Sequence, residues 1–281
     1  MRSSNVCPKS EAPPDWSAAK KAYDALAARY DRIPEENRIN RILRARSLDS
    51  LRILFRPGQQ ILEIGCGTGD EAIELAALGV RVLAVDPSPE MVRIARAKAE
   101  GRGVGDRVTF REASAREIAS IPWGPERFDG AYASFSLAYE PDLRPVAAAL
   151  HGLLGPGAIL AVSLPSRVCL SEWVVSLAAM RPSIAGRRLR PWYGHKVGGF
   201  SVPIRSHTPA GLARDFAPAF VLLRWEAMTC LVPPPSMNRV YGRLDGLADA
   251  IERADGVLRR TRVFRSIGDH FLAELRHTAT V

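Results

Sequence analysis

The nine residues from Ile61 to Gly69, ILEIGCGTG, constrain the fold of this chain more than any other segment. They begin with the apolar run of a strand that is covered on both faces. Glycines at positions 65, 67 and 69 follow, and because glycine has no Cβ, they let the backbone turn sharply and approach a ligand closely. The segment therefore predicts a strand that ends in a ligand-binding turn.

An amphipathic helix is expected directly after the glycines. Its apolar face is formed by Ala72, Ile73, Ala76 and Ala77, and Gly79 ends it. A strand, a glycine loop and a helix in this order predict a nucleotide-type binding site at the carboxyl edge of a parallel sheet.

The spacing of the glycines excludes two common nucleotide sites. A dinucleotide fingerprint needs glycine at its sixth position, where this chain has Asp70, and no lysine follows the loop as in a phosphate-binding P-loop. Glu63, two residues before the first glycine, would repel a phosphate. It would suit a ligand that carries an amino or sulfonium cation.

The E-x-G-x-G-x-G pattern resembles the first motif of the class I S-adenosylmethionine (SAM) dependent methyltransferases. The resemblance implies SAM as the cofactor; no metal is expected, because the sequence has no recognisable metal-binding constellation. It also implies that the cofactor contacts six residues of this segment: Glu63, Gly65, Cys66, Gly67, Thr68 and Gly69.

A second buried strand, RVLAVD, ends at Asp86, about 20 residues beyond the loop. A carboxylate at this place can accept hydrogen bonds from both ribose hydroxyls. Ser88 is expected to cap the next helix. The resemblance implies that the stretch from Pro87 to Met91 holds the ribose and lays an apolar side chain on the adenine.

Later segments resemble the third, fourth and fifth strands of the family, at residues 108–113, 128–134 and 154–164. The predicted fold is α/β: a Rossmann-like, doubly wound sheet of seven strands, mostly parallel, with an antiparallel last strand between its neighbours. N-terminal cap helices and an insertion after the fifth strand complete it.

One position departs from the family pattern. After the third strand the family usually has an aspartate that binds the adenine amino group, whereas this chain has Ser114, followed by Ala115. A serine oxygen can also accept a hydrogen bond but carries no charge. The change is either a tolerated variant or a cause of weakened cofactor binding.

A second resemblance lies near the N-terminus, in AYDALAARYD. Many small-molecule methyltransferases have such a helix over the cofactor. Tyr23 and Tyr30 are seven residues apart, so they are predicted to share one helix face. They would either close over the cofactor or serve as packing residues of a cap.

The chain is predicted to form a disordered lead, residues 1–15, and one methyltransferase domain, residues 16–281. The domain divides into cap helices (16–56), a SAM-binding core (57–165), an irregular insertion that roofs the substrate (166–206) and C-terminal strands and helices (207–281). Within the last part we expect a helix at 208–216, a helix of about 20 residues after Pro233–Pro235, and a last strand at 269–275.

Composition excludes several classes of protein. No run approaches about 18 apolar residues, so no membrane span is expected. The N-terminus lacks the apolar segment of a secretory signal, and four scattered cysteines form neither a zinc motif nor a disulfide framework. A cytoplasmic location is therefore expected, and the sequence does not indicate an oligomeric state.

The net charge of +9 raises the question of nucleic-acid binding. The densest basic patch, residues 181–196, interleaves arginines with aromatic residues. However, the chain lacks the D/N-P-P-Y/F motif and the Pro-Cys pair of DNA methyltransferases. A nucleic-acid partner remains possible but is not favoured over a small-molecule acceptor.

Methyl transfer from a sulfonium is an in-line displacement, which depends mainly on holding the reactants in position. The resemblance places Ser134 and Phe135 beside the sulfonium. A general base is needed when a hydroxyl must lose its proton, and the candidates are His195, His207, Tyr139 and Glu140. His151, His270 and His277 are not favoured for this role.

The sequence thus predicts transfer of a methyl group from SAM to oxygen, nitrogen or carbon of a small molecule. Two alternatives remain open. The first is an enzyme that methylates RNA or a protein side chain. The second is a SAM-binding sensor or assembly protein without turnover.

Overall fold

Seven strands form one mixed sheet in the computed structural model, which describes residues 15–124, 127–178, 180–244 and 246–278. In chain order they are β1 (Gln60–Ile64), β2 (Arg81–Asp86), β3 (Val108–Glu112), β4 (Phe128–Ala133), β5 (Leu154–Pro165), β8 (Phe220–Ala227) and β9 (His270–His277). The order across the sheet is β3-β2-β1-β4-β5-β9-β8. β9 runs antiparallel between β5 and β8, as the sequence predicts.

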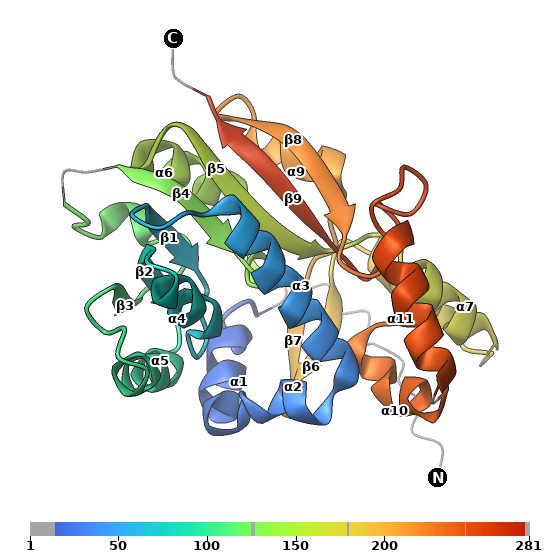
Figure 1. Cartoon of the computed structure of the whole chain (residues 1–281). Coiled ribbons are helices and arrows are strands. Elements are labelled where there is room, and N and C mark those ends of the chain that lie inside the picture. Colours follow the sequence, from blue (N-terminus) through green and yellow to red (C-terminus); the bar gives the residue numbers. More distant parts are fainter. Residues whose placement is uncertain (1–14, 125–126, 179, 245, 279–281) are drawn as a thin grey trace.

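Helices cover both faces of the sheet (Figure 1). One face carries α3 (Arg38–Leu54), α4 (Asp70–Ala77) and α5 (Pro89–Gly101), and the other carries α6 (Arg144–Leu153) and α9 (Pro209–Phe216). β1 and β4 lie at the centre, so their residues are buried on both faces. The predicted doubly wound architecture is therefore confirmed. In α4, Leu75 is buried and the predicted core residue Ala77 is exposed.

Several short elements precede the sheet. They are α1 (Ala18–Leu26), the 3-10 turn η1 (Ala27–Arg29) and α2 (Arg32–Glu36). Tyr23 lies in α1 and Tyr30 follows η1, so the prediction that both share one helix is wrong. Their rings nevertheless meet edge to face, 6.0 Å apart, because the turn brings Tyr30 back toward α1.

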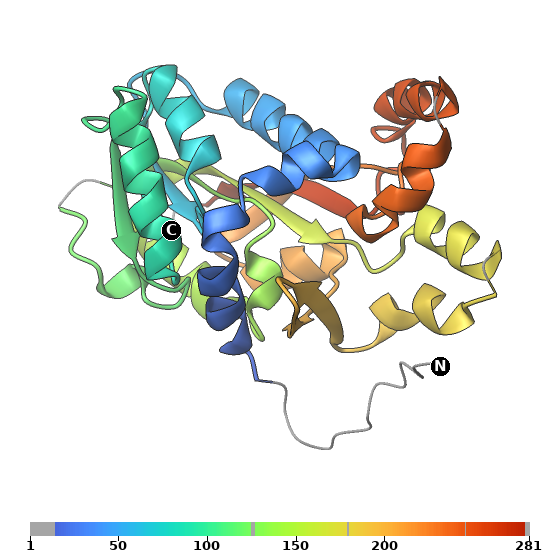
Figure 2. The same ribbon diagram turned by 90° about the horizontal axis from the view of Figure 1, so that it is seen from below.

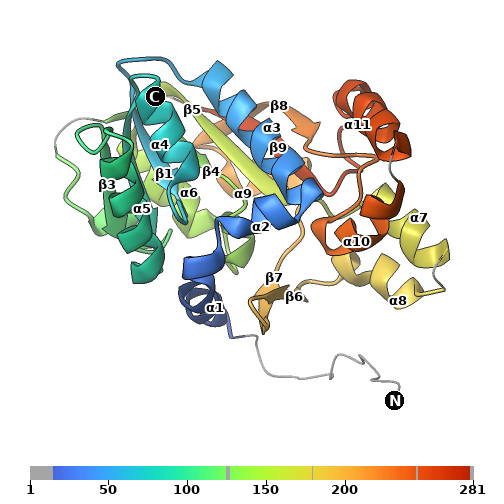
Figure 3. The same cartoon turned by 60° about the horizontal axis from the view of Figure 1, so that its bottom comes forward.

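The insertion after β5 is more regular than expected. It contains α7 (Leu170–Ala178), α8 (Pro182–Ala185), the 3-10 turn η4 (Arg187–Leu189) and a hairpin of β6 (Tyr193–Val197) and β7 (Phe200–Ile204). The turn has two glycines, Gly198 and Gly199, both with positive φ, which suits a tight hairpin. Figure 3 shows the hairpin close to α1, and Val197 and Val202 pack there against Ala22.

The C-terminal third differs from its prediction at one helix. The expected helix of about 20 residues is divided into α10 (Asn238–Tyr241), the 3-10 turn η6 (Gly242–Leu244) and α11 (Gly246–Leu258). Glycines at 242 and 246 explain the division, because glycine disfavours a helix interior. The helix predicted at 208–216 is confirmed as α9, with Thr208 as its N-cap.

Three short 3-10 turns complete the elements: η2 (Ile118–Ser120), η3 (Leu137–Tyr139) and η5 (Pro235–Met237). Among the described residues, no helix is long and apolar enough to cross a membrane. The predicted disordered lead falls almost wholly outside the described residues.

The core on the α6 and α9 face gives a first test. Phe271, the second residue of β9, is fully buried between β5 and β8. We expect Phe271→Ala to lower the free energy of unfolding by about 3–5 kcal/mol, through lost burial and the cavity left behind. Denaturant unfolding measures this. Val221→Ala, at a half-exposed site on β8, is the control and should cost less than about 1 kcal/mol.

Candidate functional site

The loop between β1 and α4 depends on glycine at each of its three glycine positions. Gly65, Gly67 and Gly69 have φ of 76°, 52° and 81°, a region that other residues rarely adopt. At Gly65 a Cβ atom would lie 2.2 Å from the Cβ of Ser136. The Ser136 hydroxyl donates to the backbone carbonyl of Ile64 at 2.5 Å. Glycine at 65 therefore lets the segment after β4 pack directly on the loop.

The carboxyl group of Asp86, at the end of β2, holds this loop in place. One oxygen accepts the Gly67 N–H at 2.8 Å, and the other accepts the Ser88 N–H at 2.9 Å. Burial raises the pKa of Asp86 to about 6, against the opposing effect of these two hydrogen bonds. The group is therefore mostly ionised at neutral pH and becomes neutral in mild acid.

Two further acids lie under the loop. Glu63 on β1 is buried, and its Oε2 atom has no hydrogen-bond partner within the described part of the chain. Burial, and then the charge of Glu71, raise the pKa of Glu63 well above its usual value. Burial also raises the pKa of Glu71, while Arg44 opposes that shift.

A small cavity of about 40 Å³ opens against the loop. It is lined by Tyr30, Arg44, Gly65, Cys66, Gly67, Thr68, Asp70, Glu71, Ser134 and Phe135. Six of these ten were predicted site residues in the loop or after β4, and Tyr30 was predicted from the cap. Glu63 is not among them.

Sequence reasoning missed Arg44, Asp70 and Glu71. Arg44 lies on α3, where it donates to Asp70 at 2.7 Å and sits 4.7 Å above the ring of Tyr30. No local pattern marks Arg44, since it lies 21 residues before the first glycine of the loop. Asp70 and Glu71 form the first turn of α4, where acids are common for helix stability alone.

The N-terminal cap covers the cavity. A Cβ atom on Gly67 would lie 3.4 Å from the ring of Tyr30. Tyr23 shares a 2.5 Å hydrogen bond with the hydroxyl of Tyr139, and the two rings meet edge to face. Pockets for ligands of cofactor size usually measure several hundred Å³, so a ligand of that size requires the cap to move.

Polar contacts tie the cap to both predicted cofactor motifs. Asp24 accepts from the Ser88 hydroxyl, and Asp31 accepts from the Thr68 hydroxyl, each at 2.5 Å. Lys98 of α5 also donates to Asp31 at 2.8 Å. Figure 2 shows α1 beside the carboxyl edge of the sheet. These hydrogen bonds hold the cap against the glycine loop and the start of α5.

The residues predicted near adenine lie beyond Asp86. Ser88 caps α5, as predicted, by accepting the Met91 N–H at 3.1 Å. Met91 and Ala115 are buried, and Pro87 is partly exposed. The hydroxyl of Ser114 donates to Glu117 at 2.7 Å, so its oxygen keeps lone pairs that can accept a further hydrogen bond.

Ser134 and Phe135 follow β4 at the centre of the carboxyl edge. The hydroxyl groups of Ser134 and Ser47 share a hydrogen bond of 3.0 Å. Phe135 has a positive φ of 57°, which is rare for a bulky residue. Its N–H donates to the Ser163 hydroxyl at 2.8 Å. Strain of this kind often accompanies a functional site.

The four candidate bases have different surroundings. Tyr139 is engaged with Tyr23, and burial raises its pKa above the usual value. Glu140 accepts from Arg116 at 2.7 Å. Burial, followed by the charge of Arg205, lowers the pKa of His207 to about 4. His195 lies exposed on β6.

Some arginines of the predicted basic patch, residues 181–196, form ion pairs within the protein. Arg187 and Arg188 both donate to the buried Glu172 on α7. Charges that are paired in this way are not available to a phosphate backbone.

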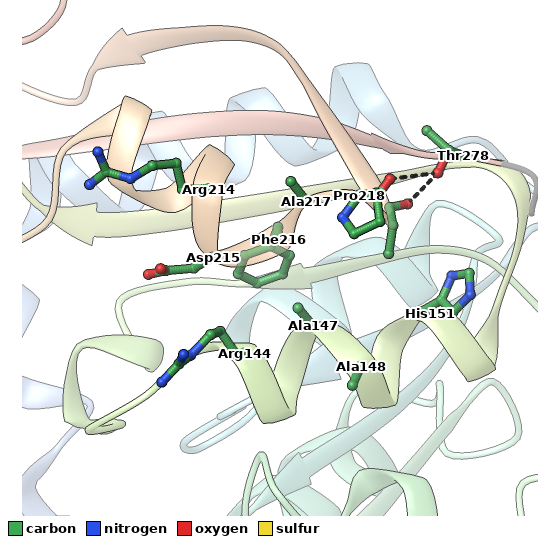
Figure 4. A pocket seen from close by; sticks show the side chains of 11 residues that line it. Arg144, Ala147, Ala148, His151, Arg214, Asp215, Phe216, Ala217, Pro218 and Thr278 are labelled. Carbon is green, nitrogen blue, oxygen red and sulfur yellow. Dashed lines mark hydrogen bonds between the residues drawn. The ribbon is translucent and has the colours of Figure 1, made fainter.

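A larger cavity of about 620 Å³ lies elsewhere, between α6 and α9 (Figure 4). It reaches the amino edge of the sheet, where β8 begins, and Ala147, Phe216 and Pro218 contribute to its apolar lining. None of the predicted site residues lines it. The glycine loop and Asp86, rather than the size of a cavity, therefore locate the candidate site.

The residues at the carboxyl edge fit SAM. A glycine loop leaves space that a Cβ atom would fill at Gly67, and a carboxylate is available for ribose hydroxyls. Acidic side chains line the cavity, where a ligand with an amino and a sulfonium cation is favoured, and no set of residues suited to a metal occurs in the described ranges.

Comparison with solved structures supports the fold. The [4+2]-cyclase SpnF superposes with a TM-score of 0.61 at 20% identity, over 96% of this chain and all of that chain. A SAM-dependent methyltransferase from Methanosarcina mazei gives 0.56 at 18% identity, over 82% of this chain and 97% of that one. At this identity the likeness concerns the fold alone.

Residues 61–157 match the family model described as a methyltransferase domain. A methyltransferase-domain model thus matches the central part of the chain, and the fold is similar to that of solved SAM-dependent methyltransferases.

Curated relatives match a part of the chain of similar length. The O-methyltransferase rstn1 of Aspergillus nomiae is 34% identical over 107 residues, which is 38% of this chain and 46% of that protein. The ubiquinone biosynthesis O-methyltransferase of Xanthomonas campestris is 33% identical over 111 residues, 40% of this chain and 45% of that protein. The matched stretch thus spans less than half the length of either relative.

The raised pKa of Asp86 predicts a pH dependence of SAM binding. Protonation removes the charge that accepts the ribose hydroxyls, so affinity should stay constant above neutral pH and fall below pH 6. Between pH 7 and pH 5 we expect a loss of about tenfold. Calorimetric titration from pH 5 to pH 8 measures it. The Asp86→Asn variant should bind SAM weakly, and its affinity should not fall between pH 7 and pH 5. An equal fall in affinity in that variant would show that another group titrates.

Gly67 gives the second test of the site. We predict that Gly67→Val abolishes SAM binding, because a branched side chain would fill the approach to the loop and strain a backbone with positive φ. Calorimetry measures affinity, and circular dichroism checks that the variant is folded. Gly157→Val is the control, since Gly157 also has positive φ but lies on β5 with open space around it. Retained affinity in a folded Gly67→Val protein would exclude the loop as the cofactor site.

Proposed function

We propose that this protein is a SAM-dependent methyltransferase that acts on a small molecule. The proposal rests on the hydrogen bond from the Gly67 N–H to the carboxylate of Asp86. This bond brings the glycine loop together with the acid predicted to bind ribose, at the carboxyl edge of the sheet. A carboxyl edge at the centre of a doubly wound sheet is the usual ligand site of such folds.

Residues from several elements at the carboxyl edge have separate roles under this proposal. Asp86 would accept the ribose hydroxyls, and Met91 and Ala115 would contact the adenine. Arg44 would face the carboxylate of the methionyl end, and Ser134 and Phe135 would lie beside the sulfur. When bound, SAM supplies a methyl group that is activated for attack by its sulfonium.

The protein's own contribution to the reaction is position and the exclusion of water. Holding two reactants in line is worth roughly 7–11 kcal/mol in well-oriented systems. The cap around Tyr23 and Tyr30 would close over the site through its bonds to Ser88 and Thr68. Closing expels water from a reaction in which charge disappears.

The surroundings of the site favour a small acceptor. The cap and the hairpin of β6 and β7 pack on each other through Ala22, Val197 and Val202, so they leave a narrow approach. Arg187 and Arg188 are used inside the protein, which argues against an extended nucleic-acid surface. The curated relatives are named as O-methyltransferases, which supports a hydroxyl as the acceptor group.

The fold alone does not select this chemistry, since a protein named as a cyclase shares it. A sensor that binds SAM without turnover is the second candidate. Only Ser114, in place of the usual aspartate, favours it.

Transfer of an isotope-labelled methyl group tests the proposal. The full chain is incubated with methyl-labelled SAM and a panel of phenols, catechols, amines and a bulk RNA fraction, and products are identified by mass spectrometry. We expect label in one or more small molecules and its loss in Asp86→Ala. Label in RNA alone would contradict a small-molecule acceptor and indicate an RNA methyltransferase. SAM binding with no labelled product from the panel would favour the sensor.

A further inference from the structure

Asp269 and His270 form a hydrogen-bonded pair at the start of β9. The Nδ1 atom of His270 lies 2.9 Å from a carboxylate oxygen of Asp269. His270 pairs in register with Pro165, the last residue of β5. Since β9 is antiparallel, its first residue lies at the carboxyl edge of the parallel strands, on the same side as the glycine loop.

The ring of His270 reaches the predicted site. It meets the ring of Phe135 edge to face at a centroid distance of 5.1 Å, and Phe135 lines the cavity against the loop. The side chain of His270 is 18% exposed. It is therefore open to a small molecule placed beside Phe135.

Asp269 is fixed as a carboxylate. It is 1% exposed, and the buried Arg188 donates both to its side chain and, at 2.8 Å, to its backbone carbonyl. Burial opposes ionisation, but the interactions with His270 and Arg188, including the hydrogen bonds that both donate, outweigh it and lower the pKa of Asp269. A negative charge thus persists beside His270 across the physiological range of pH.

This arrangement selects one form of the imidazole. Nδ1–H donates to Asp269, so Nε2 carries the lone pair. Across the described parts of the chain, Nε2 of His270 has no hydrogen-bond partner. The other charged groups around the pair are His195 on β6, with Arg187 and Arg188 on η4.

We propose that His270, oriented by Asp269, takes the proton from a hydroxyl group of the methyl acceptor. The inference rests on the proposed methyltransferase function and makes it more specific, because the acceptor group is then an ionisable hydroxyl.

The step balances without another reactant. The hydroxyl oxygen forms its bond to the methyl carbon as the carbon–sulfur bond breaks, and the electron pair of that bond stays on sulfur. The hydroxyl proton moves to Nε2 of His270. The imidazolium that results is stabilised by the carboxylate of Asp269 and then releases its proton to water.

The other candidates are less suited to this step. His207 has a pKa lowered to about 4, which makes it a weak base. Tyr139 is bonded to Tyr23, and Glu140 is paired with Arg116. His195 has no carboxylate hydrogen bond in the described ranges that would fix its tautomer.

The pair of Asp269 and His270 is also in contact with the insertion after β5. Arg188 belongs to the insertion and is held by the buried Glu172 of α7. It therefore positions Asp269, which in turn orients His270. Asp269 and Arg188 are positioning residues, and His270 alone would touch the acceptor.

The test compares the wild type with His270→Gln, using the full chain. The acceptors are the phenol, catechol and amine members of the panel above, whose hydroxyl groups are largely un-ionised at neutral pH; 4-nitrocatechol, which ionises near neutral pH, is kept for the spectroscopic readout. General bases contribute about 10²–10⁴-fold, so we expect kcat/KM for hydroxyl acceptors to fall at least about 100-fold at neutral pH. The KM for SAM should change little. The lost rate should return as pH rises, because hydroxide then ionises the acceptor.

A second readout does not depend on turnover. With S-adenosylhomocysteine bound, 4-nitrocatechol should show the absorbance of its anion at a lower pH with wild type than in free solution, and this shift should vanish in His270→Gln. His151→Gln, on α6 near the opposite end of β9, is the matched control and should retain both properties. Affinity of His270→Gln for S-adenosylhomocysteine, measured by calorimetry, should stay within about twofold of wild type.

The outcomes separate the two proposals. Absence of SAM binding in wild type contradicts the proposed function. Transfer to amines alone, or SAM binding without transfer to any hydroxyl, contradicts the hydroxyl assignment. Equal rates and equal anion spectra in wild type and His270→Gln contradict the role of His270 and leave the methyltransferase function intact.

Discussion

The hydrogen bond from the Gly67 N–H to the carboxylate of Asp86 is the constraint on which the site depends. It joins the loop after β1 to the end of β2, and the second carboxylate oxygen fixes the turn that starts α5. The same carboxylate is buried at a cost that raises its pKa. Each oxygen of this buried carboxylate accepts one backbone N–H, so the group cannot rotate away, and it keeps further lone pairs that can accept hydrogen bonds from a ligand.

The remaining parts of the site come from segments that are distant in sequence. The cap before β1, the turn after β4, the insertion after β5 and the start of β9 all meet at one edge of the sheet (Figure 3). Their contacts are largely polar at the cap, through Ser88 and Thr68, and buried and ionic at the insertion, through Arg188 and Glu172. Under the proposed function, the hydrogen bonds of the cap would let it open to admit the cofactor, while the buried ion pairs would keep the insertion fixed beside the acceptor.

Local sequence patterns predict those features that local physics decides. The apolar run before Gly65, the acid at Asp86 and the N-cap at Ser88 each depend on a few adjacent residues, and all three are found where expected. The sheet of seven strands with an antiparallel last strand between its neighbours is also predicted, although from resemblance to a family and not from the residues alone. Sequence analysis fails where the break of a helix, or a contact between distant segments, determines the structure. Gly242 and Gly246 divide a helix that its apolar pattern favours, and a turn after Leu26 separates Tyr23 from Tyr30.

His270 is the clearest example of a residue whose position depends on contacts between distant segments. In the sequence it is one of five histidines, near a C-terminal strand, without a motif around it. Its place beside Phe135 follows from the antiparallel insertion of β9 next to β5, and its bond to Asp269 depends on Arg188, some 80 residues earlier. Arg44 is similar, since α3 brings it to the loop across the sheet face.

The most direct test of the central claim is a crystal structure of the full chain with S-adenosylhomocysteine. We expect the ligand to lie across the carboxyl edge, with its ribose on Asp86, its sulfur beside Ser134 and Phe135, and Tyr30 displaced from Gly67. A ligand bound instead in the cavity between α6 and α9 would contradict the proposed cofactor site, as would a ligand at the carboxyl edge that makes no contact with Asp86.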